Sequence, residues 1–338
     1  MSERCGNGTD SQPAGRPGSR PVVGVEIGGT KLQAALGTRD GEILRLVTER
    51  ARPDGRAQGI RTQTKSLVRR LIEEGAADGG KQPEAIGVGF GGPVDSSSGT
   101  VLVSHQVEGW NDFPLKRWFE EEFGLSAAVE NDSNAAGWAE YRCGGGRGCR
   151  NMVYMNIGSG IGGAIVVNGA LYNGQGLGAG EIGHTYVPNL WGTSNKDRPF
   201  DKVENLCSGW SIERHLRQVD RIPHKSPLYE MTEGRPNRIT GPVIAEAAER
   251  GDRLVLEMLG RTTDMLGLAI ANVIMLLHPE RFIIGGGFAQ MGKPLFERLR
   301  AAVEGSVFAP FKGRYEILPA QLEQNVVLVG ALLLAPEK

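Results

Sequence analysis

The stretch Pro21-Val-Val-Gly-Val-Glu-Ile-Gly-Gly-Thr-Lys-Leu-Gln-Ala-Ala-Leu36 decides the fold, because an apolar run enters a glycine pair and a second apolar run follows at once. This pattern predicts two strands joined by a tight turn, and residues 42–48 add a third short strand. Residues 152–157, a glycine turn at 158–163 and the apolar residues 164–167 repeat the pattern. The repetition predicts two related halves, each opening with a glycine-cornered hairpin and continuing into α/β units.

Length and charge exclude several classes of protein. The chain has 338 residues, about twice the usual length of a single domain, so two packed domains are expected. Lys and Arg number 38 against 39 Asp and Glu, and the net charge of -1 gives no drive toward nucleic acid or anionic membranes. Nucleic acid is therefore not expected as a partner.

The termini and the cysteines indicate a cytoplasmic protein. Residues 1–20 are polar and rich in Gly, Ser and Pro, which predicts a disordered tail without a targeting segment. The longest apolar run, 265–277, is too short to cross a bilayer. The chain has only 4 cysteines at irregular spacing, so reduced thiols are expected rather than a disulfide framework.

Elsewhere, the hydrophobic spacing predicts alternating helices and strands. Helices are expected over 60–72, 115–123 and 242–277, and strands over 85–90, 126–130 and 281–284. Two segments, 190–205 and 217–239, have no clear period and are expected to be loops or insertions.

Three glycine turns follow strand-like segments, at 28–31, 158–163 and 285–287. A single such turn is usually structural, but three in one chain could bring backbone N–H groups to the phosphates of a nucleotide. Gly158, Gly160 and Gly163 also match G-x-G-x-x-G. A strand rather than a helix follows them, so the pattern predicts no dinucleotide-binding turn; the turn at 28–31 likewise lacks the spacing of a P-loop.

Asn131 and Asp132 come directly after a predicted strand, where open α/β sheets often carry their chemistry. A carboxylate held near a sugar hydroxyl can accept its proton as the oxygen attacks a phosphoryl group. The alternative is that Asp132 caps the helix that begins near Ser133. Glu181 and His184 form a second polar cluster.

Taken together, these motifs resemble the ROK sugar kinases of the actin, sugar kinase and Hsp70 ATPase superfamily, over about residues 21–335. Val25 to Lys31 is similar to the first phosphate motif, Glu130 to Ala136 to the catalytic segment, and Asn156 to Gly163 to the second phosphate motif. Gly180 to His184 and His278 to Gly287 are similar to the sugar and adenosine motifs.

The resemblance implies a fold, and with it a division of the chain. It implies an α/β protein of two actin-like (ribonuclease H-like) domains with an active-site cleft between them. The first domain would span 21–131 and the second 132–324, with a C-terminal helix over about 325–338 packing back on the first. A homodimer is also implied.

The resemblance also implies a role for each site residue. Asp132 would be the general base for a sugar hydroxyl, expected to be that on C6. Mg²⁺ would bridge the phosphates, with Glu26 acting on it indirectly. The other hydroxyls of the sugar would meet Gly92, Asn131, Glu181, His184 and Glu204. The nucleotide would lie against Gly28, Gly29, Thr30, Lys31, Gly158, Ser159, Gly160, Gly285, Gly286 and Gly287.

The sequence departs from the family pattern in two places. Many members carry a cysteine-rich zinc motif before the Glu that corresponds to Glu204; here residues 185–203 contain no cysteine, and Lys202 stands where the last zinc ligand would be. We therefore expect no zinc, and Cys143 and Cys149 lack the two further ligands of a structural site. Glu26 replaces the more common Asp, as in fructokinase-like members.

The sequence thus predicts an ATP-dependent carbohydrate kinase, glucokinase-like or fructokinase-like, that phosphorylates a hexose or N-acetylhexosamine. Three alternatives stay open: a sugar-binding sensor with impaired catalysis, a kinase that uses polyphosphate, and a member of the repressor branch. The last is disfavoured because only about 20 polar residues precede the first strand, too few for a winged helix-turn-helix.

Overall fold

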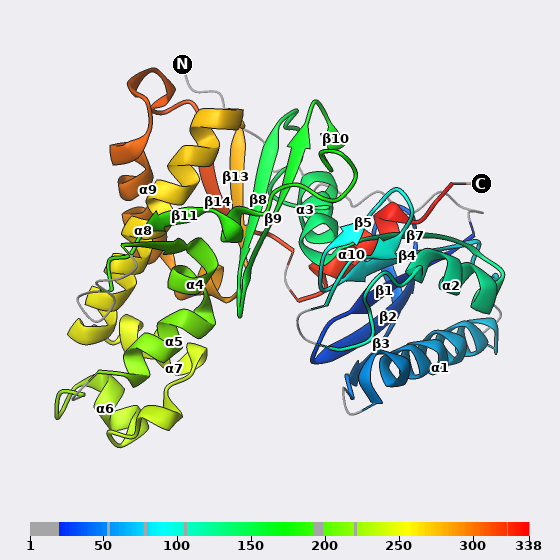
Figure 1. Cartoon of the computed structure of the whole chain (residues 1–338), viewed down its shortest axis with the longest axis horizontal. Helices are drawn as coiled ribbons and strands as arrows, with labels where there is room; N and C mark the ends of the chain where they lie inside the picture. Colours follow the sequence, from blue (N-terminus) through cyan, green and yellow to red (C-terminus); the bar gives the residue numbers. More distant parts are fainter. Residues whose placement is uncertain are drawn as a thin grey trace, which may run out of the picture.

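The computed structural model describes residues 20–52, 55–77, 80–104, 107–191, 199–219, 222–322 and 324–337. Of the predicted tail, all but Arg20 lies outside these residues. Two bodies, each a five-stranded sheet with helices, lie side by side (Figure 1). This is the mixed α/β fold that the sequence predicts.

The first sheet has the strand order β3-β2-β1-β4-β7. β1 pairs antiparallel with β2 and parallel with β4, so the glycine turn after β1 lies at the same edge of the sheet as the ends of β4 and β7. The strands are β1 (Val22–Ile27), β2 (Lys31–Gly37), β3 (Ile43–Arg50), β4 (Ala85–Phe90) and β7 (Ser126–Asn131). A short hairpin of β5 (Val94–Asp95) and β6 (Thr100–Val101) follows β4.

The second sheet repeats this topology in the order β10-β9-β8-β13-β14. β8 again pairs antiparallel with the next strand and parallel with a later one. The strands are β8 (Met152–Ile157), β9 (Ile161–Val167), β10 (Ala170–Leu171), β13 (Arg281–Gly285) and β14 (Glu316–Pro319). The predicted relation between the two halves is therefore confirmed at the level of strand order.

Helices complete each body. In the first, α1 (Arg56–Ala77) packs on β2 and α2 (Leu115–Phe123) on β7. The second has α4 (Val203–Cys207), α5 (Gly209–Arg217), α6 (Pro227–Thr232), α7 (Gly241–Glu249), α8 (Arg253–Leu277) and α9 (Lys293–Ser306). By length and composition α8 could cross a membrane, but 61% of its most apolar window is buried inside the structure. It is a core helix.

The predicted loops are wrong in part. The hairpin of β11 (Tyr186–Pro188) and β12 (Phe200–Lys202) and the start of α4 lie in or beside 190–205, although residues 192–198 are outside the described part of the chain. The segment 217–239 contains α6, which Ser226 caps through its side chain. Elements this short depend on tertiary packing, such as the burial of Leu228, rather than on a long periodic pattern.

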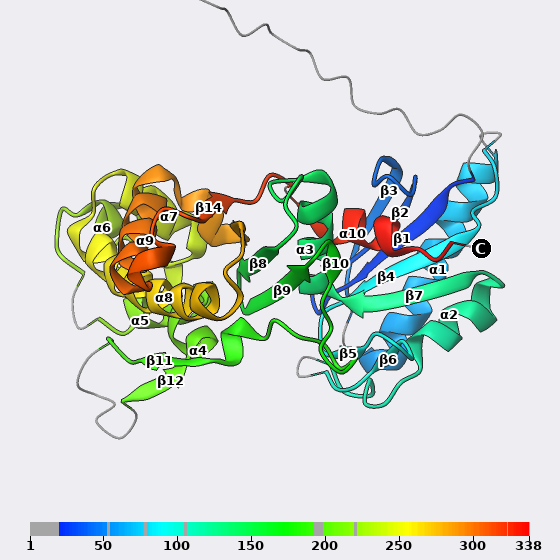
Figure 2. The same ribbon diagram turned by 90° about the horizontal axis from the view of Figure 1, so that it is seen from above.

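Two helices lie where the bodies meet, α3 (Asp132–Cys143) and α10 (Val326–Leu334), as Figures 1 and 2 show. They contact each other, and α10 also packs on β1 and β4. Glycines allow this approach: a Cβ on Gly330 would lie 1.9 Å from the Ala135 carbonyl oxygen, and one on Gly87 would lie 1.8 Å from that of Ala331. The exact domain boundaries, 131/132 and 324/325, stay a prediction.

Candidate active site

The end of β7 places Asn131 and Asp132 at the junction of the two bodies. Asn131 is the N-cap of α3, and its side-chain oxygen accepts hydrogen bonds from the backbone N–H groups of Ser133 and Asn134. Its amide nitrogen donates to the Gly92 carbonyl oxygen at 3.0 Å. The sequence left open whether Asp132 is the cap; the structure gives that role to Asn131, which leaves Asp132 in the first turn of the helix.

The two oxygens of Asp132 differ in their environment. Oδ1 accepts hydrogen bonds from the Ser133 N–H at 2.7 Å, from Asn131 Nδ2 at 3.2 Å and from Ser133 Oγ at 3.3 Å. Within the described residues, no hydrogen bond reaches Oδ2, which lies next to Gly91. Burial raises the pKa of this carboxyl, the donors on Oδ1 lower it, and the negative charge of Glu181 raises it again. The carboxylate is therefore oriented through one oxygen, and the other can act as a base.

The first glycine turn lies next to Asp132. A Cβ on Gly91 would meet both Asp132 Oδ2, at 3.5 Å, and the Cα of Gly28, at 3.6 Å. Gly28 N–H donates to the Lys31 carbonyl and closes the turn. Lys31 Nζ lies 3.2 Å from Glu26 Oε1 in an ion pair. Burial raises the pKa of Glu26, although the ion pair with Lys31 lowers it.

The second glycine turn, between β8 and β9, lies on the other side of α3. A Cβ on Gly162 would clash with Ser133 Oγ, so the absence of a side chain there lets this hairpin pack closely on the first turn of α3. Glu204 Oε2 accepts a hydrogen bond from the Ile161 N–H at 2.8 Å and lies against Gly160. Glu204, expected to bind sugar, thus also supports the turn expected to bind phosphate.

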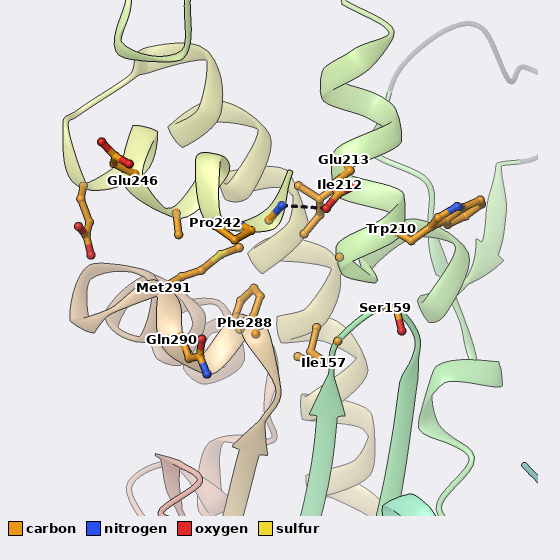
Figure 3. Close-up of a pocket in the computed structure, with 16 residues that line it drawn as sticks. Ile157, Ser159, Trp210, Ile212, Glu213, Pro242, Glu246, Phe288, Gln290 and Met291 are labelled. Atoms are coloured by element: carbon orange, nitrogen blue, oxygen red, sulfur yellow. Dashed lines mark hydrogen bonds between the residues drawn. The ribbon is translucent and has the colours of Figure 1, made fainter. Parts of the chain in front are cut away.

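A pocket of about 940 Å³ begins at this turn and extends into the second body (Figure 3). Ser159 lies at one end, at the tip of the β8–β9 hairpin, and Glu246 lies at the other. Apolar groups and three carboxylates line it: Ile157, Trp210, Ile212, Pro242, Ala245, Phe288, Met291, Glu213, Glu246 and Glu249. Glu213 accepts a hydrogen bond from the Gly241 N–H at 2.8 Å, which fixes the start of α7.

Of the third glycine run, Gly287 lines the pocket. Gly285 and Gly286 lie behind it: a Cβ on Gly285 would clash with the Tyr154 hydroxyl, and one on Gly286 with the Ile157 carbonyl. Sequence reasoning missed the other walls, because they come from the separate helices α5 and α7 and from the turn of 3-10 helix at Gly287–Met291. The pair Ser208-Gly209 is a signal that could have pointed to one of these walls, because Ser208 caps α5 and Gly209 lines the pocket.

Glu181 is the N-cap and His184 the last residue of a 3-10 turn, Ile182–His184, on the approach to β11. Both are exposed. The negative charge of Glu181 contributes to raising the pKa of Asp132, after the larger effect of burial. Lys202 Nζ lies 3.0 Å from His184 Nδ1. Because an ammonium group only donates, Nδ1 acts as acceptor and the proton of the neutral ring is on Nε2.

Comparison with known proteins agrees with this arrangement. The model of the ROK family matches residues 22–338. The chain belongs to the ROK family. It is 32% identical to a glucokinase of Thermotoga maritima over 94% of this chain and 98% of the relative. The crystal structure of a ROK family glucokinase from Streptomyces griseus, in complex with glucose and AMPPNP, is 31% identical with a TM-score of 0.77, covering 93% of this chain and 99% of that one.

The ROK family also includes regulators. A xylose repressor of Caldicellulosiruptor bescii is 26% identical over 78% of this chain and 65% of its own length. Membership of the ROK family therefore gives the actin-like sugar kinase fold, but leaves the choice between enzyme and regulator to the site itself.

Two metals are relevant to this ROK protein, zinc and magnesium. Among the described residues, no group of three or more His, Cys, Asp or Glu side chains is placed to hold a metal ion. Part of the segment where other ROK proteins carry zinc, 192–198, lies outside the described residues; beside it, an ammonium group rather than a thiolate adjoins His184. Mg²⁺ fits better, because it commonly binds through one or two carboxylates and substrate phosphates, and buried Glu26 Oε2 has no partner within the described structure.

Proposed function

We propose that the protein is an ATP-dependent sugar kinase that transfers the γ-phosphoryl group to a hexose or N-acetylhexosamine, at the hydroxyl on C6, with Asp132 as general base. The observation that carries the proposal is the asymmetry of the Asp132 carboxylate. Three hydrogen bonds hold Oδ1, while Oδ2 stays free of them among the described residues, at the point where both glycine turns and the neighbouring body meet.

In this mechanism Oδ2 accepts the proton of the sugar hydroxyl as its oxygen forms a bond to the γ-phosphorus, and the bond to the bridging oxygen of ADP breaks. The remaining hydroxyls are held by Asn131, Glu181, His184, Glu204 and the Gly92 backbone. His184 donates from Nε2, since Lys202 lies on the other ring nitrogen. These groups orient the acceptor, and orientation supplies much of the rate in such transfers.

Both glycine turns present backbone N–H groups to the phosphates, with Lys31 and Ser159 as further donors. Glu26 would hold Mg²⁺ through water, and the ion would neutralise charge on the phosphates. The exposed hydroxyl of Ser159 lies at the entrance to the large pocket, so the phosphates and the base of one nucleotide can occupy the turn and the pocket together.

The pocket favours ATP over polyphosphate as donor. Among the described residues that line it there is no Lys or Arg, while Glu213, Glu246 and Glu249 are acidic. A polyanion would be repelled from such a wall, whereas a neutral aromatic base packs against Phe288, Met291 and Pro242. The volume of the pocket, about 940 Å³, is in the range of sites that bind small ligands.

The test is donor consumption by the purified protein with Mg²⁺ and glucose, fructose, mannose, N-acetylmannosamine or N-acetylglucosamine. We expect turnover of at least one sugar with ATP and none with polyphosphate. Asp132→Asn should lower kcat by a factor of about 10²–10⁴ and leave the affinity for sugar within a few-fold, because a general base acts mainly in the transition state. Asp112→Asn, at an exposed site on the first body, is the matched control.

Near-normal kcat in Asp132→Asn would contradict the assignment of the base. A second candidate is a sugar-binding regulator, which the repressor relative favours. It would be supported if calorimetry detected sugar binding by a protein that consumes neither donor. The homodimer and the cytoplasmic location stay predictions.

A further inference from the structure

Glu130 is a buried carboxylate with no role in the mechanism above. It is only 5% exposed and directly precedes Asn131 and Asp132 in β7. A buried charge is costly unless it is fully hydrogen-bonded, so its partners show what holds it there.

Four donors surround this carboxylate. Oε1 accepts from Ser96 Oγ at 2.8 Å, from the Asn131 N–H at 2.9 Å and from Asn134 Nδ2 at 3.0 Å. Oε2 accepts from Asn173 Nδ2 at 2.9 Å. An ionised carboxylate only accepts, so each of these contacts requires a donor and fixes the orientation of the amide that supplies it.

The donors come from both bodies. Ser96 follows β5 in the first, Asn134 is in the first turns of α3, and Asn173 follows β10 in the second. Asn134 Nδ2 also donates to Asn173 Oδ1 at 3.2 Å, and its own buried oxygen has no partner within the described structure. The Asn134 NH₂ group therefore donates to both Glu130 and Asn173, and the Asn134 Oδ1 is left without a hydrogen bond in the described structure.

A backbone hydrogen bond also joins the β5–β6 hairpin of the first body to the glycine-rich segment of the second. The Ser96 N–H donates to the Gly176 carbonyl at 3.1 Å. Residues 173–180 form the glycine-rich segment that leads to Glu181, and every second residue from 174 to 180 is a glycine with a positive φ. The last of these glycines, Gly180, packs against the backbone of Gly163 in β9, and Ile182 is buried. Residues 174–179 bring few side chains to pack, so this part of the segment depends on hydrogen bonds such as these for its position.

We infer that Glu130 is a positioning residue for the sugar site: it ties the 173–180 segment of the second body to the catalytic segment of the first. Glu181 and Asp132 then face one sugar from opposite sides. This inference rests on the proposed function in one respect, that Glu181 and Asp132 contact the sugar; the tie between the two segments stands on the hydrogen bonds alone.

A double-mutant cycle tests the donor and acceptor pattern. Glu130→Gln sets an NH₂ group against the NH₂ of Asn173, and Asn173→Asp sets two carboxylates against each other. In the double variant, the amide introduced at position 130 donates to the carboxylate introduced at position 173. That carboxylate still accepts from Asn134, and the net charge is that of the wild type. Each single change thus breaks the tie, and the pair restores it.

Kinetics are measured with Mg-ATP and glucose, or the sugar of the panel that the wild-type protein turns over fastest. We expect each single variant to raise KM for sugar by about tenfold or more, the range for loss of a hydrogen bond to a charged group. The double variant should return to within about threefold of wild type. KM for ATP should stay within about twofold, because the nucleotide pocket contacts none of these residues.

Asp252→Asn is the matched control for loss of a buried carboxylate. Asp252 is 1% exposed and accepts hydrogen bonds from the Leu228 and Val255 N–H groups, in the second body away from the network. It should lower Tm and leave KM for sugar unchanged. Ser96→Ala, which removes one donor and keeps the charge, is the milder variant if Glu130→Gln folds poorly, and should raise KM for sugar about threefold.

Hydrogen exchange of the 173–181 amides separates this inference from the proposed function. Exchange should be faster in Glu130→Gln and restored in the double variant, whether or not the protein turns over sugar. A wild-type protein without turnover would refute the kinase and leave the tie to be decided by exchange. Unchanged exchange and unchanged KM for sugar in Glu130→Gln, or a double variant no better than the worse single one, would overturn the inference.

Discussion

Glu140 offers a prediction about how the two bodies are held together. It lies in α3, is 0% exposed, and accepts three backbone hydrogen bonds: from Gly145 at Oε2, and from Gln321 and Leu322 at Oε1, at 2.9, 2.9 and 2.6 Å. The chain passes between the bodies at α3 and again between β14 and α10. This one carboxylate therefore fastens the two crossings to each other.

Replacement by Ala would leave three N–H groups without their acceptor. A buried unsatisfied donor costs about 1–3 kcal/mol; the Gly145 donor is buried and the other two are partly buried, so Glu140→Ala should lower the free energy of unfolding by about 3 kcal/mol. Glu140→Gln keeps one acceptor oxygen but sets an NH₂ group against a donor, so a loss of about 1–3 kcal/mol is expected. At roughly 2 cal/mol/K per residue, 3 kcal/mol corresponds to about 4 °C in Tm for a chain of this length.

The assay is thermal unfolding followed by circular dichroism, with urea unfolding as a second measure. Glu280→Gln is the matched control, because Glu280 Oε1 also accepts two backbone hydrogen bonds, from Arg150 and Asn151, but is exposed, so that water can replace it. Its Tm should fall by less than about 1 °C. Should Glu140→Ala melt within about 1 °C of wild type, or no lower than the control, the argument from buried donors would be refuted.

Three further predictions concern the catalytic base, the histidine and the C-terminal helix. Burial raises the pKa of Asp132, and the base must be ionised, so kcat/KM should fall as the pH drops through a value above the usual 3.8. Ser133→Ala removes a donor to Oδ1 and should therefore move this acid limb of the pH profile to higher pH. An acid limb that moves to lower pH or does not move would count against Asp132 as the base. Lys202→Met should raise KM for sugar several-fold with a smaller change in kcat, because His184 loses the group that fixes its tautomer. Equal kinetics in the variant and the wild-type protein would exclude this role of Lys202. Gly330→Ala should lower Tm, because its Cβ would meet the Ala135 carbonyl oxygen at 1.9 Å. Gly305→Ala in α9, where the Cβ meets nothing within 4 Å, should leave Tm unchanged or raise it. A lower Tm for Gly305→Ala than for Gly330→Ala would show that α10 does not dock as described.

The sequence predicts the parts of this structure that depend on local pattern. The hairpins around the glycine turns were expected because alternating apolar runs and glycine pairs leave few other conformations. Asn131 and Asp132 were found as candidate site residues because the apolar pattern of a buried strand ends at these two polar residues. The recurrence of the first hairpin predicted two related halves, whereas the order of the strands in each sheet came from the structure.

Other features depend on contacts between distant residues, which a single sequence does not contain. Glu140 and Glu130 look like ordinary acidic residues in a helix and a strand, and only the fold shows that both are buried among donors. Trp210 and Met291 are far apart in the sequence and line one pocket. The hairpin of β11 and β12 was missed because its strands, of three residues each, are too short to show a period.

The docking of α10 has a consequence for how the protein is made. The face of β1 and β4 that this helix covers is synthesised early, but Leu328 and Leu332, which are fully buried there, are synthesised only after the second body. Domains usually fold as they emerge, N-terminal first. Here the first body has to wait, with part of its sheet uncovered, while the whole of the second is translated. The emerging chain therefore exposes apolar sheet surface during synthesis, and a ribosome that stops before α10 releases a protein whose first body stays incomplete.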